Sequence, residues 1–260
     1  MPELVQVAED IYYLEDEINH GIIHIGGRKC VVIDSGLLDD NAMTILAALE
    51  AAGLELHTII NTHSHADHYG GNDYLVGKTG CKVCAPSFEA AIMQNPTLES
   101  LYIFGASPPS ELTQPFLLAK KSPVDTILDE GNIVIGEKEL KIISLKGHSP
   151  NQIGIMVDDV LFCADSLFSL DAWRKFLLVY AVNIGDMIDS IETVKKSGAR
   201  SFIPSHAAPT GDIIELAEVE HGGARLEFHL PGEDGGPPLE YSHHDVGTDE
   251  GNPTSRVPRN

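Results

Sequence analysis

The sequence predicts one layered α/β domain followed by a tail of different composition. Short runs of apolar and β-branched residues, bounded by Gly, Asp and Asn, recur along most of the chain, and helical patterns lie between them. The chain has 260 residues, 43% of them hydrophobic, which is enough for one large core without a second domain. We expect the domain to span residues 1–219, with a helical insertion at about 97–122.

The first half of the chain alternates strands with helices. Strands are expected at residues 11–14, 21–25, 30–33, 57–61 and 82–85. Helices are expected at 39–52, from Gly70-Gly71 to about 78, and from a cap at Ser87 to just before Asn95. The first three strands follow one another at short intervals, so they should form a meander.

The second half begins with the insertion and then returns to strands. Pro108-Pro109 divides the insertion into two short helical patterns, around 101–104 and 112–119. Strands are expected at residues 126–128, 133–135, 140–143, 154–157, 160–163 and 201–203. A helix at 184–196 should turn Ile188, Ile191 and Val194 inward.

The end of the chain has a different character. A helix starting near Gly211 is cut short at Glu220, and residues 220–260 form an acidic, Gly/Pro-rich tail. This tail has little that can pack a core, so we expect it to be appended or disordered and assign it no function.

Composition narrows the classes of partner. The formal net charge of −22 disfavours nucleic acid, because non-specific affinity for phosphates comes from Lys and Arg. The start of the chain lacks a secretory pattern, and no apolar run is long enough to span a bilayer. We therefore expect a cytoplasmic protein with no membrane partner.

Four cysteines lie within or beside apolar runs, which predicts buried free thiols: Cys30, Cys81, Cys84 and Cys163. Cys81 and Cys84 have the spacing of a zinc knuckle, but no second pair completes it. Residues three apart in a strand point to opposite faces, so this pair should belong to the core.

Seven residues of metal-ligand type follow the ends of predicted strands. They are His63, His65, Asp67, His68, His148, Asp165 and His206. All should stand at one edge of the sheets. The first four lie within six residues. In an extended segment the side chains at 63 and 65 share a face, whereas those at 67 and 68 point away from it because the chain turns into a helix. Two ions can each take one pair; His148 can then complete the first, His206 the second, and Asp165 can bridge them.

These residues resemble the ordered motifs of the metallo-β-lactamase superfamily across roughly residues 11–218. The segments that carry the resemblance are His63-Ser64-His65-Ala66-Asp67-His68-Tyr69-Gly70-Gly71, Gly147-His148-Ser149, Asp165 and Ser205-His206. The resemblance implies an αββα sandwich of two mixed β-sheets flanked by helices, with a dinuclear metal site at one edge. It gives His63, His65 and His148 to the first ion, Asp67, His68 and His206 to the second, and Asp165 to both. The ions would be two divalent metals, zinc before iron or manganese.

The resemblance also suggests a role for Asp34 and a class of reaction. Asp34 matches the family's early aspartate and would hold a ligand histidine by a hydrogen bond. The family's exported zinc β-lactamases commonly carry Cys where this chain has Asp165, and its RNA-processing members need a basic surface. What remains is hydrolysis of a small ester-like bond (thioester, lactone, ester or phosphoester), as in hydroxyacylglutathione hydrolases and lactonases. A hydroxide bridging the metals would attack, with Asp67 as ligand and proton acceptor.

Three alternatives stay open. A mononuclear non-haem iron enzyme, similar to the sulfur dioxygenases of this superfamily, would use mainly His63, His148 and Asp165. A β-lactam hydrolase or a promiscuous phosphodiesterase would use the whole set. A degenerate member that only binds a ligand would lack some of the ligand residues, and here none is missing. The number of bound ions per chain separates the first alternative from a dinuclear hydrolase.

The sequence also offers candidates for the walls of a substrate pocket beside the metal site. Aromatic candidates for the pocket walls lie in the insertion and in residues 167–180: Tyr102, Phe104, Phe116, Phe168, Trp173 and Tyr180. Aromatics spaced in this way belong more often to a core or a dimer contact than to a substrate pocket, so no substrate-binding residue is named. A homodimer is one interpretation of the insertion. Asn151 stands where many relatives have glycine, which would change the loop after His148.

Overall fold

The computed structural model describes residues 3–106, 118–169 and 180–211, apart from the side chain of Phe104. The chain divides into two units, residues 1–223 and 224–260, and every described residue belongs to the first. The helix expected near Gly211 and the tail lie outside the described residues, as does most of the second helical pattern of the insertion.

One sheet has seven strands in chain order, β1-β2-β3-β4-β5-β6-β7. Its strands are β1 (Val5–Ala8), β2 (Ile11–Glu15), β3 (Asn19–His24), β4 (Lys29–Ile33), β5 (Glu55–Ile60), β6 (Lys82–Pro86) and β7 (Thr126–Leu128). Strands β2, β3 and β4 form the expected antiparallel meander, and β1, which the sequence analysis did not predict, extends it at one edge. From β4 to β7 the strands are parallel, because a helical segment crosses between each pair.

The other sheet has five strands in the order β12-β11-β10-β9-β8. Its strands are β8 (Gly131–Ile135), β9 (Lys138–Ser144), β10 (Ile153–Val157), β11 (Val160–Ala164) and β12 (Ser201–Pro204). Pairing is antiparallel from β8 to β11 and parallel between β11 and β12. Strands β9, β11 and β12 therefore run in the same direction and end at the same edge.

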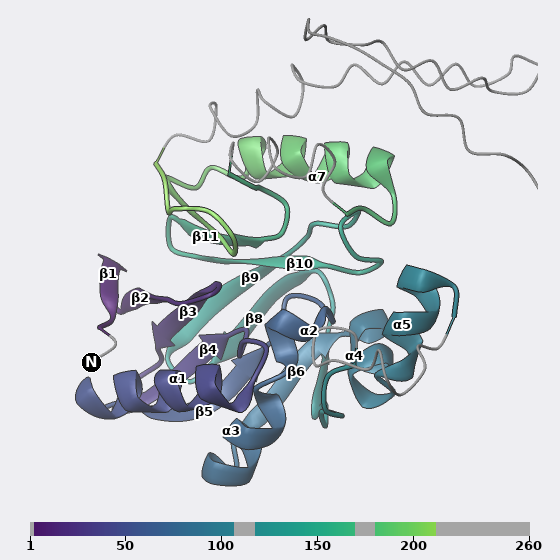
Figure 1. Ribbon diagram of the computed structural model, residues 1–260. Helices are drawn as coiled ribbons and strands as arrows, with labels where there is room; N and C mark the ends of the chain where they lie inside the picture. Colours follow the sequence, from purple (N-terminus) through teal and green to yellow (C-terminus); the bar gives the residue numbers. More distant parts are fainter. Residues whose placement is uncertain (1–2, 107–117, 170–179, 212–260) are drawn as a thin grey trace, which may run out of the picture. The chain divides into compact units, whose positions relative to one another are not determined.

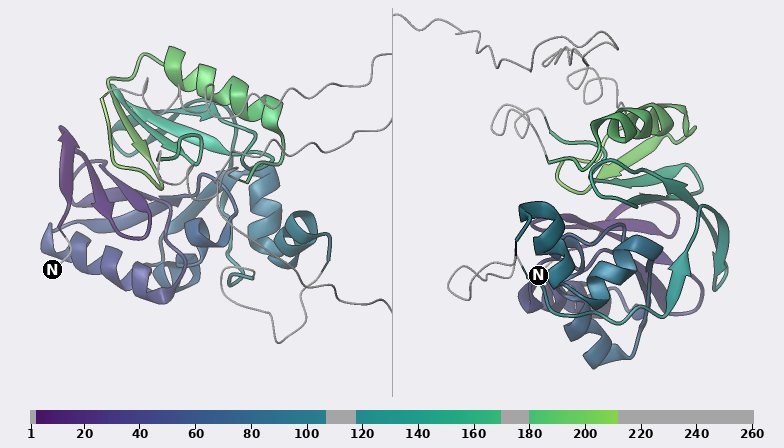
Figure 2. Two further views of the ribbon diagram at one scale, coloured as in Figure 1. Left: turned by 45° about the horizontal axis from the view of Figure 1, so that its top comes forward. Right: turned by 90° about the vertical axis from the view of Figure 1, so that its right-hand side faces the viewer.

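Helices cover the outer faces of both sheets (Figure 1). They are α1 (Asp39–Ala51), α2 (Ala66–Tyr69), α3 (Asn72–Thr79), α4 (Ser87–Gln94), α5 (Thr97–Phe104) and α7 (Ile184–Lys196). Helices α1 and α3 pack on the seven-stranded sheet, α7 packs on the five-stranded sheet, and further views keep them on opposite sides of the strands (Figure 2). The expected αββα sandwich of two mixed sheets is confirmed.

Three hydrophobic layers hold the sandwich together. The middle layer joins the two sheets and includes Ile33 and Ile60 from one and Ile142 and Ile203 from the other. The outer layers lie beneath α1 and α3 on one side and beneath α7 on the other. Burial of this apolar surface, at about 25 cal/mol per Å², is the main force that stabilises the fold.

The cysteines confirm the expected alternation of faces. All four are buried and free. Cys81 belongs to the layer beneath the helices, whereas Cys84 belongs to the layer between the sheets. The pair therefore cannot clasp one ion, and both thiols act as small core residues.

Two helical details differ from the sequence prediction. Ile188 of α7 is 46% exposed, so its expected inward position is wrong; the buried stripe of this helix is Met187, Ser190, Ile191 and Val194. Ser190 belongs to it because its hydroxyl donates to the Lys146 carbonyl oxygen, a contact that hydrophobic periodicity cannot reveal.

The start of α4 also differs. Helix α4 begins at Ser87 itself, and no side chain caps it at the preceding Pro86. Ser87 is therefore the first helical residue and not the expected cap.

Among the residues that the structure describes, no helix has both the length and the apolar character needed to cross a membrane.

Gly70 and Gly71 let the backbone after α2 lie directly against the turn that follows β4. A Cβ atom on Gly70 would overlap the Leu37 carbonyl oxygen, and one on Gly71 would overlap the Ser35 carbonyl oxygen. Backbone atoms cannot move aside as a flexible side chain can. The two glycines thus fix the helical end of the histidine-rich loop against the end of β4.

We expect Gly70→Ala to destabilise the fold by about 1–3 kcal/mol or more, because the new methyl group overpacks a rigid backbone contact. Gly77→Ala is the matched control, since a Cβ there would face open space within the described part of the chain. Gly77 lies inside α3, so the control should gain about 0.5–1 kcal/mol of helix propensity. Urea unfolding of both variants measures the difference, and equal free energies of unfolding would contradict the packing argument.

Candidate metal centre

The seven predicted side chains converge at the edge of the sandwich where parallel strands end. His63 and His65 follow β5, His148 follows β9, Asp165 follows β11 and His206 follows β12. Asp67 and His68 lie on α2, the single helical turn that the histidine-rich loop enters directly after His65. The structure thus brings together residues that are more than 140 positions apart in the sequence.

Three histidines form one corner of this centre. His65 Nδ1 lies 3.1 Å from His63 Nε2 and 2.9 Å from His148 Nε2. The three nitrogens face a common point, and all three side chains are buried. His148 Nδ1 donates to the Tyr180 carbonyl oxygen at 2.9 Å, which directs its Nε2 toward the other two rings.

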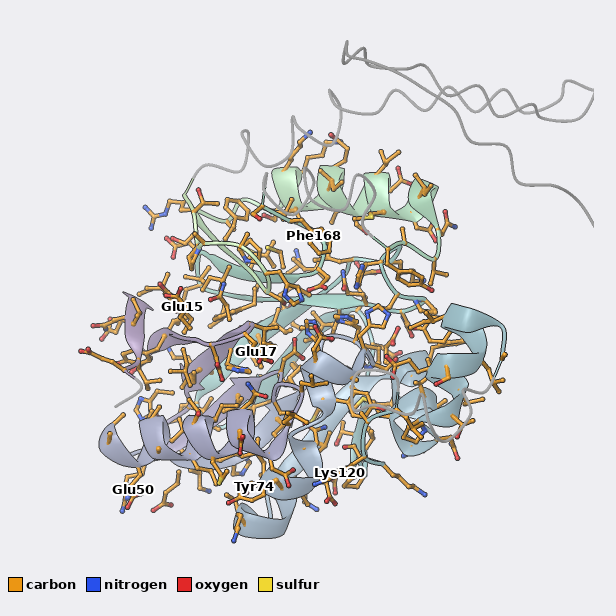
Figure 3. All side chains as sticks on the ribbon, in the orientation of Figure 1. Glu15, Glu17, Glu50, Tyr74, Lys120 and Phe168 are labelled. Atoms are coloured by element: carbon orange, nitrogen blue, oxygen red, sulfur yellow. The ribbon has the colours of Figure 1, made fainter. Side chains whose placement is uncertain are left out.

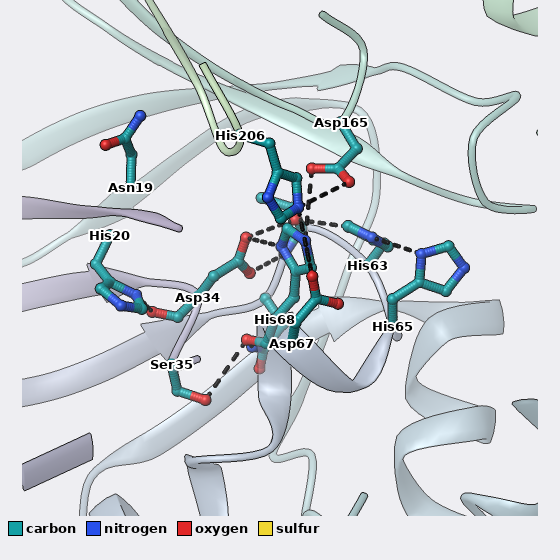
Figure 4. Close-up of polar contacts among 12 residues, drawn as sticks. Asn19, His20, Asp34, Ser35, His63, His65, Asp67, His68, Asp165 and His206 are labelled. Atoms are coloured by element: carbon teal, nitrogen blue, oxygen red, sulfur yellow. Dashed lines mark hydrogen bonds and ion pairs between the residues drawn. The ribbon is translucent and has the colours of Figure 1, made fainter. Parts of the chain in front are cut away.

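Asp67, His68 and His206 form the adjacent corner (Figure 4). Asp67 Oδ2 lies 3.3 Å from His206 Nε2 and 3.8 Å from His68 Nε2. The side chains of Asp67 and His206 are 18% and 29% exposed, whereas that of His68 is fully buried. This corner is therefore where solvent reaches the cluster.

Asp165 lies between the two corners. Its Oδ2 is 3.2 Å from His148 Nε2 and 3.3 Å from His206 Nε2, and its Oδ1 is 3.4 Å from His68 Nε2. One buried carboxylate thus faces histidines of both groups, which is the geometry that a bridging ligand requires.

Asp34 holds His68 and the start of the histidine-rich loop in place by hydrogen bonds. Its carboxylate accepts hydrogen bonds from His68 Nδ1 at 2.8 Å, from the Thr62 amide at 2.8 Å and from the Thr62 hydroxyl at 2.7 Å. Asp34 adopts a left-handed backbone conformation with φ of 59°, which Asp tolerates better than most residues. This hydrogen bond orients the His68 ring so that Nε2 faces Asp165.

Burial keeps the three-histidine corner neutral. Desolvation lowers the pKa of His65 to about 3, with a further contribution from the neighbouring His148. Burial also lowers the pKa of His63 well below its usual value and lowers that of His148. Neutral imidazoles offer free lone pairs, so this corner suits a cation.

The second corner is held by charge pairing. Burial alone would lower the pKa of His68, but Asp165, Asp67 and Asp34 outweigh it and raise that pKa well above its usual value. The Asp165 charge raises the pKa of His206 to about 10. Burial acts to raise the pKa of Asp67, yet His68 and His206 bring it down to about 2. A divalent cation can take the place of the protons that these imidazoles share with the carboxylates.

The donor set fits two divalent metal ions. Within the described residues, His68 Nε2 and Asp165 Oδ1 are buried without a hydrogen-bond partner, although they face each other. Unsatisfied buried polar atoms are costly, and a cation between them would satisfy both. Five imidazoles and two carboxylates are ligands that suit zinc, iron and manganese.

Aromatic rings lie beside the cluster. The Tyr180 ring lies edge-on to His65 and His148 at 5.6 Å and 6.0 Å, and the Tyr102 ring stacks on His65 at 6.3 Å. Phe168 lies on the side that α7 covers, near both His148 and His206 (Figure 3). Of the other aromatic candidates, Phe116, Trp173 and the side chain of Phe104 lie outside the described residues.

Some supporting residues escaped the sequence analysis. Asn19 of β3 donates through Nδ2 to the carbonyl oxygens of Pro204 and Ala207, and its amide donates to the Ser205 carbonyl oxygen. It therefore holds both sides of the loop that carries His206. A lone Asn among strand residues gives no signal in sequence, because its partners lie about 185 positions away.

Solved structures of metallo-β-lactamases share this fold. The enzyme from Pontibacter korlensis superposes with a TM-score of 0.67 over 85% of this chain and all of its own, at 14% identity. The B3 enzyme BLEG-1 superposes with a TM-score of 0.62 over 79% of this chain and 95% of its own, at 21% identity. At such identities the similarity defines the class of fold alone.

The sequence family is also defined. The family model of the metallo-beta-lactamase superfamily matches residues 15–206, which include every residue of the cluster. The chain belongs to the metallo-β-lactamase superfamily.

Curated relatives carry the name hydroxyacylglutathione hydrolase. The protein of Rhodospirillum rubrum is 27% identical over 176 residues, which are 67% of this chain and 55% of the relative. That of Methylococcus capsulatus is 25% identical over 179 residues, which are 68% of this chain and 56% of the relative. The chain spans about half the length of the curated relatives it matches.

We expect Asp34→Asn to weaken zinc binding about 10- to 100-fold, the usual effect of losing a hydrogen bond behind a ligand. An Asn amide placed beside His68 would donate to Nδ1 and move the imidazole proton to Nε2, the atom that faces Asp165. Asp158→Asn is the matched control, because Asp158 has a similar φ of 51° but lies in an exposed turn. Chelator competition measures both variants, and equal zinc affinities would contradict the role of Asp34.

Proposed function

We propose that this protein is a dinuclear metal-dependent hydrolase that cleaves a small ester-like bond, with a thioester as the leading substrate class. The observation that carries the proposal is the pair of three-residue donor groups joined by Asp165. His63, His65 and His148 would hold one ion, and Asp67, His68 and His206 the other. Zinc is the leading candidate for both ions.

The chemistry divides between the ions and the side chains. Two divalent ions, when bound, polarise the scissile carbonyl or phosphoryl oxygen and lower the pKa of the attacking water. Asp165 would set the separation of the two ions because it faces histidines of both groups. Among the described side chains of the centre, those of Asp67 and His206 are the most exposed to solvent, whereas that of His68 is fully buried.

Asp67 is the carboxylate that would handle the proton. It is more exposed than Asp165 and Asp34, so it can contact both an entering substrate and a water molecule. Its depressed pKa keeps it ionised at neutral pH, where a carboxylate can orient the attacking water and accept its proton. His206 lies 3.3 Å away and holds the carboxylate in place.

The relatives favour the thioester over the other bonds. Curated proteins that are similar in sequence are named hydroxyacylglutathione hydrolases, and a hydroxyacylglutathione is a thioester. The β-lactamases that share the fold are too distant in sequence to argue for a β-lactam substrate. The same centre could also hydrolyse a lactone, an ester or a phosphoester.

The alternative of a mononuclear iron oxygenase explains less of the centre. It would use His63, His148 and Asp165 as ligands. It would not explain why Asp67, His68 and His206 form a second group of possible metal ligands. Metal content separates the two: two ions per chain support the hydrolase, whereas one iron with oxygen uptake supports the oxygenase.

Metal removal should abolish hydrolysis, and two equivalents of zinc should restore it. We expect the reconstituted protein to hydrolyse members of a panel of thioesters, tested beside lactones, phosphodiesters and β-lactams.

Asp67→Asn should lower turnover about 10²- to 10⁴-fold, the range expected when a proton acceptor is lost. Asp73→Asn, at an exposed position on α3, is the control and should keep full turnover. Unchanged turnover in Asp67→Asn, or no hydrolysis of any substrate by the zinc-loaded protein, would contradict the proposal.

A further inference from the structure

Glu89 of α4 is a buried carboxylate that contacts two ligand-bearing loops without belonging to the ligand set. Its side chain is fully buried. It accepts hydrogen bonds from the Ser64 amide at 3.0 Å, the Ser64 hydroxyl at 2.6 Å, the Ser149 hydroxyl at 2.9 Å and the Asn151 amide at 2.7 Å. No other carboxylate of the described residues is placed in this way between the two loops.

The two oxygens of Glu89 divide the loops between them. Oε2 takes both donors of Ser64, the residue between His63 and His65. Oε1 accepts hydrogen bonds from Ser149 and Asn151, which lie one and three residues after His148. A single rigid group therefore spans the gap between the loops that supply all three histidines of the first corner.

Charge suits Glu89 to this task and excludes its amide analogue. All four contacts are made by donors, and an ionised carboxylate can accept every one of them. An amide of the same shape has one oxygen and one NH₂ group, and the NH₂ group would face the backbone amide of either Ser64 or Asn151, so a donor would be set against a donor. Burial raises the pKa of Glu89 above its usual value, although the hydrogen bonds from Ser64, Ser149 and Asn151 oppose that shift.

Asn151 makes the connection reciprocal. While its amide donates to Glu89, its side-chain oxygen accepts from the Ser87 hydroxyl at 3.3 Å and the Phe88 amide at 3.4 Å, at the start of α4. Asn151, the residue at which the sequence departs from its resemblance to the family, thus contacts the end of α4 that carries Glu89. The side-chain contacts of Asn151 are long and exposed, so they are weaker than the buried hydrogen bonds of Glu89. Glu89 is therefore the main link between the two loops.

The supports of the two corners are separate. Asp34 contacts His68, a member of the second group, and reaches the first only indirectly through Thr62. Glu89 contacts residues next to His63, His65 and His148, the three ligand candidates of the first corner. A change at Glu89 should therefore affect one ion and spare the other.

We propose that Glu89 is a positioning residue for the first metal site: it fixes the distance between the His63–His65 loop and the His148 loop so that three imidazoles meet around one ion. The proposal rests on the metal centre of the proposed function but not on the identity of the substrate. Glu89 acts through Ser64, Ser149 and Asn151 and touches neither the ion nor the substrate.

The test isolates each site before changing Glu89. His206→Ala removes a ligand of the second group and leaves the first, and His148→Ala does the reverse. Zinc is titrated by calorimetry into each background with and without Glu89→Gln. We expect the dissociation constant to rise about 10- to 100-fold in the His206→Ala background and less than threefold in the His148→Ala background.

Glu99→Gln is the matched control. Glu99 is also a buried glutamate, on α5, but it accepts one hydrogen bond, from the Ala66 amide at 3.2 Å, and does not reach the His148 loop. We expect it to change the dissociation constant in the His206→Ala background less than threefold. A purely structural role of Glu89 predicts equal losses at both sites, and that result would overturn the proposal, as would unchanged affinity at the first site.

Ser149→Ala covers the case in which Glu89→Gln does not fold. It removes one donor from Oε1 and leaves Glu89 with three hydrogen bonds, so the fold should survive. We expect at least a threefold weaker first site, and an unchanged dissociation constant would overturn the proposal. If the unaltered protein binds no zinc, the proposed function fails; if it binds two ions and Glu89→Gln binds them equally well, only this inference fails.

Discussion

The structure depends on the burial of opposite charges at one edge of a hydrophobic sandwich. Asp34, Asp165 and His68 are buried, and Asp67 lies beside them with only a small exposed fraction. Isolated buried charges are unstable by many kcal/mol, so such a cluster persists only when each charge has a partner. Protonated imidazoles provide that pairing in the second corner, and two divalent cations would provide it across the whole centre. The same constraint that keeps the site folded therefore favours metal binding.

Topology brings these groups together. Strands β4, β5 and β6 of one sheet are parallel, and β9, β11 and β12 of the other run in a common direction, so the ends of all six strands carry loops of the centre or its supports. The hydrophobic layer between the sheets fixes the position of these loops. Buried polar side chains then hold each loop from outside: Asp34 beneath His68, Asn19 beneath the His206 loop, and Glu89 between the His63 and His148 loops. Ligand geometry is thus a property of the scaffold.

Much of this could be predicted from the sequence because the informative signals are local. Hydrophobic runs predicted most strands and helices. The spacing of His63, His65, Asp67 and His68 predicted a metal site before the positions of the other ligand residues in the fold were known. Ile188 was misplaced because Ser190, a polar residue, belongs to the buried stripe of α7 through a hydrogen bond to a distant carbonyl. Glu89 was missed for the same reason: a charged residue on a helix normally faces solvent, and only the fold reveals its four donors. Long-range polar contacts leave no periodic trace in sequence.

The most direct measurement of the central claim is anomalous X-ray diffraction at the zinc absorption edge from crystals of the zinc-loaded protein. We expect two peaks a few ångströms apart, one within about 2.0–2.2 Å of nitrogens of His63, His65 and His148 and the other at a similar distance from Asp67, His68 and His206. Asp165 should contact both. A single peak, or two peaks away from these side chains, would contradict the central claim.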